Sequence, residues 1–358
     1  MDRTLESWNN VVRTLSKVIS SHPDKCLAVL SLSYHHLPNQ LKACFLSMSS
    51  FPEDFQVETQ RLIYLWIAEG FIRSSENGKS LEEVAMDYLE DLSSRNLIMV
   101  RKRRLNGEIK TCGIHDILRE FCLIEAEMTK HMHVERIMVL VIFSKVLMFS
   151  SFPLVITKLF HLRYLQVPFH QNIPESISEL QNLQTLICSG YSLESISLPV
   201  KIWTMQNLRY IRLWAATSLP SPRRESILNK HLVTRMPNLE EFSGLSCTSC
   251  TNEVFSGIPD LRRLIIQVPL LFDKYLPNEV MDISILRKLK AFKCYYWKHS
   301  WTMCISIKSS VFPTSLKRLT LSRCYLFPWE DISSTLIMLP NLEEFKLKDC
   351  KARDDIGR

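Results

Sequence analysis

The segment Asn207-Leu208-Arg209-Tyr210-Ile211-Arg212-Leu213 decides the fold, because it carries a pattern L-x-x-L-x-L that returns throughout the second part of the chain. The pattern starts at nine positions: Ile137, Leu162, Leu183, Leu208, Leu239, Leu261, Leu289, Leu316 and Leu342. Successive starts lie between 21 residues (162 to 183) and 31 residues (208 to 239) apart. An internal repeat of this period predicts a stacked, quasi-one-dimensional architecture.

Each unit has one short strand and one return segment, and neither can bury its apolar edge alone, so neighbouring units must stack into a continuous core. Most of the spacings fall in the window of leucine-rich repeats. We therefore expect a leucine-rich repeat solenoid with one parallel strand per repeat and the sheet on its concave face. The third apolar position is predicted at Cys188, Gly244 and Cys294 in three of the repeats. An Asn or Asp precedes several starts: Asn182, Asn207, Asn238, Asp260 and Asn341.

The first part of the chain has helical periodicity and one hairpin signal. Apolar spacing predicts helices over residues 4–20, 24–36, 39–48, 59–70 and 80–94. Asn106-Gly107 stands between two strand-like segments, which is a strong signal for a β-hairpin. A last helix is predicted from Ile114-His115-Asp116. Helices followed by a hairpin indicate a winged-helix unit, so the fold class is α/β, with a mostly helical winged-helix domain before the solenoid.

Composition excludes several classes of protein. The chain has 8 glycines in 358 residues, where average usage would give roughly 25, and glycine-rich phosphate loops are therefore not expected. The 11 cysteines are spread over the whole chain, which is typical of a reducing compartment and not of a secreted disulfide scaffold. The apolar segment 137–156 contains Lys145 and Pro153, so we interpret it as a repeat strand and expect no membrane span.

Three short motifs have simple structural interpretations. Gly78-Lys79-Ser80 resembles the end of a phosphate-binding loop but lacks the earlier glycine, and we predict a helix cap. The basic segment 101–104 is predicted to be a solvated hairpin arm, with phosphate contact as the alternative. His115 and Asp116 are adjacent on a helix, where neighbouring side chains diverge, so no catalytic dyad is expected.

Several segments resemble the plant intracellular resistance proteins that join an NB-ARC nucleotide-binding region to leucine-rich repeats. These segments are 30–38, 41–45, 51–54, 65–71 and 88–92, together with 173–177 and 180–186 in the early repeats. The sequence is most similar to the coiled-coil class of late blight resistance proteins, over essentially the whole chain.

The resemblance implies three domains and a function. Residues 1–21 would be a remnant helix of the NB-ARC region, 22–130 the winged-helix-like domain and 131–358 the leucine-rich repeats. His115 and Asp116 match the family's Met-His-Asp motif, which lies near the ADP phosphates. Because the P-loop and Walker B segments have no counterpart here, we expect no bound ADP or ATP and no enzymatic activity. A cytoplasmic location is expected, with peripheral membrane association left open.

Two functions follow from these features. The first is an immune-receptor fragment that recognises pathogen effectors or guarded host proteins through its repeats and regulates defence and the hypersensitive response. The second is a winged-helix nucleic-acid-binding protein with a repeat domain attached. DNA binding needs a basic recognition helix, and the helix taken for it, residues 59–70, has Arg61 as its only basic residue. This favours protein partners, no nucleic acid and the receptor function.

The variable positions of L-x-x-L-x-L carry most of the positive charge. Nine basic residues there are the candidate partner-binding residues: Arg163, Arg209, Arg212, Arg262, Arg263, Lys290, Lys293, Lys317 and Arg318. With Lys346 they make ten, against the four glutamates Glu240, Glu241, Glu343 and Glu344, a difference of 10 − 4 = +6 within a chain of net charge +7. They form either a solvated strand face or a surface that docks an acidic patch, and the sequence leaves both interpretations open.

Overall fold

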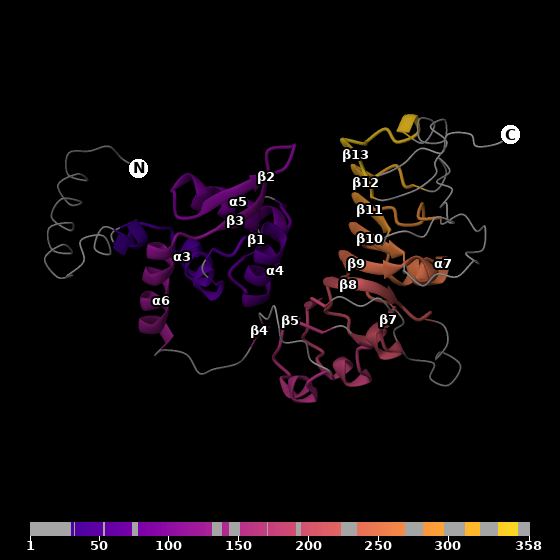
Figure 1. The fold of residues 1–358 in the computed structure, drawn as a ribbon, viewed down its shortest axis with the longest axis horizontal. Helices are drawn as coiled ribbons and strands as arrows, with labels where there is room; N and C mark the ends of the chain where they lie inside the picture. Colours follow the sequence, from indigo (N-terminus) through magenta and orange to yellow (C-terminus); the bar gives the residue numbers. More distant parts are fainter. Residues whose placement is uncertain are drawn as a thin grey trace, which may run out of the picture. The chain divides into compact units, whose positions relative to one another are not determined.

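The computed structural model describes twelve stretches of the chain: residues 30–31, 33–52, 54–73, 78–130, 138–142, 151–169, 171–190, 195–222, 235–268, 282–296, 312–322 and 336–349. It divides into two compact units, residues 1–136 and 137–358 (Figure 1). The predicted helix 4–20, most of 24–36 and the proposed remnant 1–21 lie outside the described residues.

The first unit contains a short helical bundle and a three-stranded antiparallel sheet. Its elements are α3 (Asn39–Leu46), η1 (Ser47–Ser50), β1 (Val57–Glu58), α4 (Thr59–Glu69), α5 (Leu81–Ser94), β2 (Met99–Arg103), β3 (Ile109–Gly113) and α6 (Asp116–Lys130). The strands lie in the order β1-β3-β2. Helices before an antiparallel hairpin are the predicted winged-helix arrangement, and β2 and β3 form the wing.

Local sequence explains where these elements begin and end. Ser80 caps α5 through a reciprocal capping box: its hydroxyl accepts from the Glu83 N–H, and its own N–H donates to the Glu83 carboxylate at 2.8 Å. The prediction of a cap at Gly78-Lys79-Ser80 is therefore confirmed. Gly70 ends α4 with a left-handed φ of 79°, and Gly107 turns the wing with φ 82°, as the hairpin signal predicted.

The core of this unit is built around α4. Residues Leu62 to Ala68 of that helix are all buried, so its apolar side chains face the other elements on several sides. The indole N–H of the buried Trp66 donates to the Ser47 hydroxyl at 2.8 Å, which satisfies the one polar group of that side chain. Helix α4 is therefore a packing element.

The second unit is a parallel sheet with helical return segments. Its strands are β4 (Val139–Val141), β5 (Tyr164–Val167), β6 (Thr185–Cys188), β7 (Ile196–Ser197), β8 (Tyr210–Ser218), β9 (Glu241–Ser246), β10 (Arg263–Val268), β11 (Ala291–Tyr296), β12 (Arg318–Ser322) and β13 (Glu344–Lys348). The return segments include η2 (Leu154–Lys158), η3 (Glu175–Glu179), η4 (Val200–Thr204), η5 (Cys247–Ser249) and α7 (Asn252–Gly257). In the described residues, one strand per predicted repeat pairs in the order β13-β12-β11-β10-β9-β8-β6-β5-β4, while β7 joins β8 (Figure 1).

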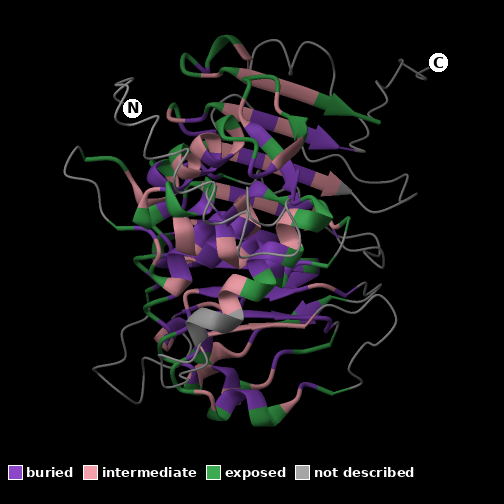
Figure 2. Ribbon diagram, turned by 90° about the vertical axis from the view of Figure 1, so that its left-hand side faces the viewer, coloured by how far each residue is buried: buried purple, intermediate pink, exposed green. Residues whose placement is uncertain are grey.

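The predicted apolar register is confirmed. Leu186 and Leu319, which would have faced solvent under a one-residue slip, are 0% and 2% exposed. The repeat leucines join one continuous core through the described repeats, which Figure 2 shows as buried segments along successive strands. In the last described strand the core thins, since Leu347 is 39% exposed.

The asparagines before the repeat starts form a ladder. The side-chain amide of Asn207 donates to the Gln181 carbonyl of the preceding repeat at 2.9 Å, and that of Asn238 donates to the Gln206 carbonyl at 2.9 Å. Asn182 and Asn341 make the same bond to Phe160 and Thr314. Each amide thus satisfies a turn carbonyl that the short strands leave without a strand partner.

One register prediction is wrong. Gly244 was expected at the third apolar position, but Leu245 occupies it, pairing with Ile266 of β10 and being fully buried. Gly244 is an inserted bulge residue with φ 101°. The strand contains one extra residue here, and only glycine adopts this backbone conformation readily.

Candidate protein-docking surface on the solenoid

The candidate basic residues lie in three rows across the sheet. The first row consists of the residues that directly follow the first leucine of a repeat. The backbone N–H of such a residue donates to the backbone carbonyl of its counterpart one repeat earlier, as Arg209 does to Gln184 and Arg262 to Glu240. The members of the rows are Arg163, Arg209, Arg262, Lys290 and Lys317 in the first, Arg263 and Arg318 in the second, and Arg212, Lys293 and Lys346 in the third. Strand pairing therefore brings the ten basic residues onto one lattice with neighbouring strands about 4.8 Å apart.

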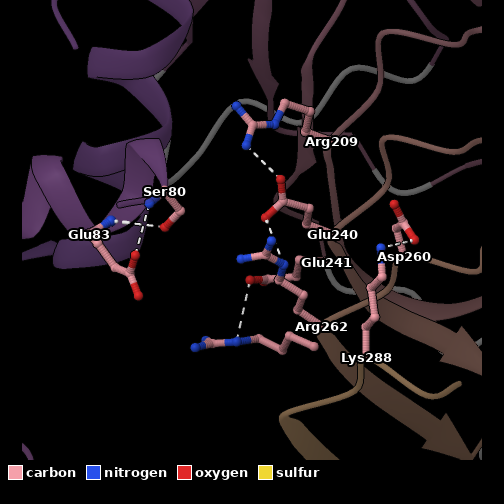
Figure 3. Close-up of polar contacts among 9 residues, drawn as sticks. Ser80, Glu83, Arg209, Glu240, Glu241, Asp260, Arg262 and Lys288 are labelled. Carbon is pink, nitrogen blue, oxygen red and sulfur yellow. Dashed lines mark hydrogen bonds and ion pairs between the residues drawn. The ribbon is translucent and has the colours of Figure 1, made fainter. Parts of the chain in front are cut away.

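Two glutamates order the central part of this lattice. Glu240 lies between Arg209, at 2.5 Å, and Arg262, at 3.6 Å (Figure 3). Glu241, whose side chain is 3% exposed, pairs with Arg212 at 3.2 Å and Arg263 at 3.5 Å. Each carboxylate is thus held by one arginine from the repeat before and one from the repeat after. The sequence alone showed these glutamates only as opposing charges.

The ion pairs give the four arginines a structural role. Removing Arg212 or Arg263 would leave the buried carboxylate of Glu241 with one arginine partner instead of two, and losing a partner is costly for a buried charge. Four guanidinium groups against two carboxylates still leave a positive excess at the centre of the face. The arginines therefore act both as supports and as part of the charged surface.

Further exposed positive charge lies farther along the sheet, around β11 and just before β12. Lys290 and Lys317 are exposed, and Lys293 is half-buried with its ammonium 5.2 Å from the centre of the Tyr295 ring. Lys317 also pairs with the exposed Glu343 at 2.6 Å, an interaction of little strength in water. This stretch offers cations that an incoming acidic group can reach.

The helix of the winged-helix unit that would enter a nucleic-acid groove is acidic. In a helix pair of this type the second helix is the one that enters the major groove, and the element order makes that helix α5, not the residues 59–70 assumed from the sequence. Helix α5 carries Glu82, Glu83, Asp87, Glu90 and Asp91 and no basic residue. Its exposed carboxylates would repel phosphates.

The basic wing is partly neutralised by the same helix. Arg103 pairs with Glu90 of α5 at 3.0 Å, and Arg104 lies 3.8 Å from Glu108 across the turn. The prediction of a solvated hairpin arm agrees with these contacts, because the end of β2 is exposed and Arg103 and Arg104 have acidic partners.

His115 and Asp116 stand at the start of α6, and both are exposed. The apolar Ile114 before them is buried. A carboxylate in the first turn competes for the N–H groups that would otherwise attract a phosphate. These two residues do not by themselves supply the loop amides and lysine that hold nucleotide phosphates, so they do not fit an ADP site on their own.

Cysteines in both units are packing residues. Burial raises the pKa of the Cys112 and Cys188 thiols to about 12, which keeps both protonated at physiological pH. Within the ranges that the structure describes, no cluster of three or more His, Cys, Asp or Glu could hold a metal ion, and no helix is long and apolar enough to cross a membrane. The apolar segment 137–156 contributes β4 and η2 to the repeats.

The chain matches the family described as "Disease resistance protein Winged helix domain" over residues 51–122 and that described as "Leucine-rich repeat region" over residues 144–354. The putative late blight resistance protein homolog R1B-16 of Solanum demissum is 32% identical over 424 residues, covering 99% of this chain and 31% of that protein. Homolog R1B-14 of the same plant is also 32% identical over 424 residues, covering 99% and 31%. The chain thus spans about a third of the length of these curated relatives.

Among solved structures, an internalin from Listeria monocytogenes is similar with a TM-score of 0.35 and 16% identity over 61% of this chain and 62% of that one. That likeness is too weak to support any argument. The sequence matches are much more specific, and neither matched family description names an enzyme domain. The chain belongs to the leucine-rich repeat family, and before the repeats it carries a winged-helix domain of the kind found in disease resistance proteins.

Proposed function

We propose that this chain is the recognition part of an intracellular plant immune receptor, and that it binds an acidic surface of a pathogen effector or a guarded host protein. Binding would regulate the defence response, including hypersensitive cell death. The relatives are named as putative late blight resistance proteins, and a parallel sheet of repeats gives an extended face suited to protein partners.

The observation that carries the proposal is the ordered basic lattice on the sheet. Cations on adjacent repeats lie in rows, and Glu240 and Glu241 fix the arginines at the centre in defined positions. Ordering the side chains in advance lowers the entropy that a partner must overcome on binding. Complementary charge chiefly raises the association rate and selects the partner.

A display experiment tests this proposal with a defined probe. A yeast-displayed library of random linear peptides is sorted against the full chain, and the recovered peptides are sequenced and their binding measured at low and physiological salt. We expect enrichment of Asp and Glu, and affinity that falls with salt, because exposed charges are screened beyond a Debye length of about 8 Å.

The structure supplies the variant and its control. Reversing Lys290, Lys293 and Lys317 to Glu should weaken binding of the recovered peptides by about tenfold or more, and it leaves Glu240 and Glu241 unchanged. The matched control reverses Lys158, Arg235 and Arg287, which are exposed in return segments, so that the change in net charge is identical.

Two results would overturn the proposal. One is an absence of acidic enrichment, and the other is an equal loss with the two triple variants, which would indicate net charge and not the sheet face. A duplex DNA bound more tightly than every recovered peptide would instead support the nucleic-acid-binding function.

A further inference from the structure

An excursion in strand β8 interrupts the otherwise regular sheet. Arg212 pairs with Ser243 of β9 and Thr217 pairs with Leu245, so residues 213–216 face the single residue Gly244. The carbonyl oxygens of Leu213 and Ala215 lie 3.0 Å or less from where a Cβ on Gly244 would stand. Gly244 therefore lets the two backbones approach closely, and the excursion is built into both strands.

The excursion presents Trp214. Leu213 is in the core, while Trp214 is 41% exposed. Burial alternates from the half-buried Arg212 through the buried Leu213 to the exposed Trp214, which places Trp214 on the same face as Arg212.

The surroundings of Trp214 are polar and fixed. Arg212 precedes it by two residues and is held by the buried Glu241, which is also bound by Arg263 from the next repeat. An aromatic side chain beside ordered arginines is the composition of energetic hot spots in protein interfaces, where Trp, Tyr and Arg predominate. The ion pairs order the two arginines before any partner arrives.

We propose that Trp214 is the anchor of the docking surface, and that the partner segment is an extended acidic stretch with a large apolar side chain close to its carboxylates. The carboxylates meet the positive excess around Arg212, and the apolar side chain packs on the Trp214 ring. This inference rests on the proposed function and adds to it the requirement for an apolar residue, which net charge alone would not impose.

The test uses the peptides recovered by the display experiment and the full chain. Acidic peptides should share an apolar residue at a fixed spacing from a carboxylate. Trp214→Ala should weaken the binding of these peptides by about thirtyfold, which is about 2 kcal/mol at 1.4 kcal/mol per tenfold. Trp214→Phe should keep most of the affinity. The matched control is Phe160→Ala, because Phe160 is an exposed aromatic residue, 61% exposed, in a turn before a strand. Circular dichroism checks that each variant is folded.

Salt separates the two contributions. Screening weakens the lysine contacts but leaves an aromatic contact almost unchanged, so the loss caused by Trp214→Ala should persist at high salt. Acidic peptides that lack a shared apolar position, or that bind Trp214→Ala as well as the native chain, overturn this inference while leaving the proposed function standing. A library without acidic enrichment overturns both.

Discussion

Replacing Gly244 with alanine should damage the solenoid far more than an exposed glycine would. Gly244 has φ 101°, a conformation that costs an L-residue about 1–3 kcal/mol. Its Cβ would also press on the carbonyl oxygen of Leu213, which is backbone and cannot rotate away; overpacking of this kind costs about 1–3 kcal/mol more. Together the two effects predict that the free energy of unfolding falls by about 4 kcal/mol, within a summed range of about 2–6 kcal/mol.

Gly107→Ala is the matched control. Gly107 has a similar φ of 82°, but nothing lies within 4 Å of the position its Cβ would take, so only the conformational cost of about 1–2 kcal/mol applies. Urea unfolding followed by circular dichroism measures the free energy of unfolding of the unit that carries each change. Hydrogen exchange of the peptides around 210–218 and 241–246 reports the local effect of Gly244→Ala. If Gly244→Ala costs no more than Gly107→Ala, the close approach of the two strands is not as described.

Four further predictions follow from particular contacts. Ser80→Ala should cost the winged-helix unit about 1 kcal/mol, because the capping box at α5 is lost, measured as a shift of the urea midpoint. Asn207→Leu should cost about 1–3 kcal/mol, because the Gln181 carbonyl loses its donor; the same unfolding curve of the solenoid measures it. Iodoacetamide at pH 8 should leave Cys188 unmodified in the folded chain and alkylate it in urea, since burial raises its pKa to about 12, and peptide mass spectrometry reads the result. Calorimetry should detect no micromolar binding of ADP to the chain, and an affinity of that order that His115→Ala abolishes would contradict the account of the α6 start.

The periodic part of the fold could be predicted from sequence because it depends on short-range rules repeated many times. Leucines at fixed offsets determine which side chains enter the core, and Leu186 and Leu319 are buried as that register requires. The cap at Ser80 and the turn at Gly107 likewise depend on residues a few positions apart.

The remaining features could not be predicted because they depend on how separate segments of the chain are arranged. Gly244 occupies the predicted third position in the pattern, and only pairing with the flanking strands reveals that Leu245 fills it. The recognition-like helix was misplaced because its position depends on the order of elements, and α5 is the helix that precedes the wing. Glu241 was counted as one opposing charge, since a sequence does not show that the repeats before and after each bring an arginine to it.

The asparagine ladder separates two kinds of change that the solenoid can accept. Asn207 and Asn238 fix the start of each strand against the previous turn, although the return segments before them differ in length, with repeat steps of 25 and 31 residues (183 to 208 and 208 to 239). Insertions in a return segment can therefore accumulate on one side of the protein without shifting the grid of side chains on the other. Single substitutions on that grid can therefore change the exposed side chains of the sheet while the length of the chain varies independently.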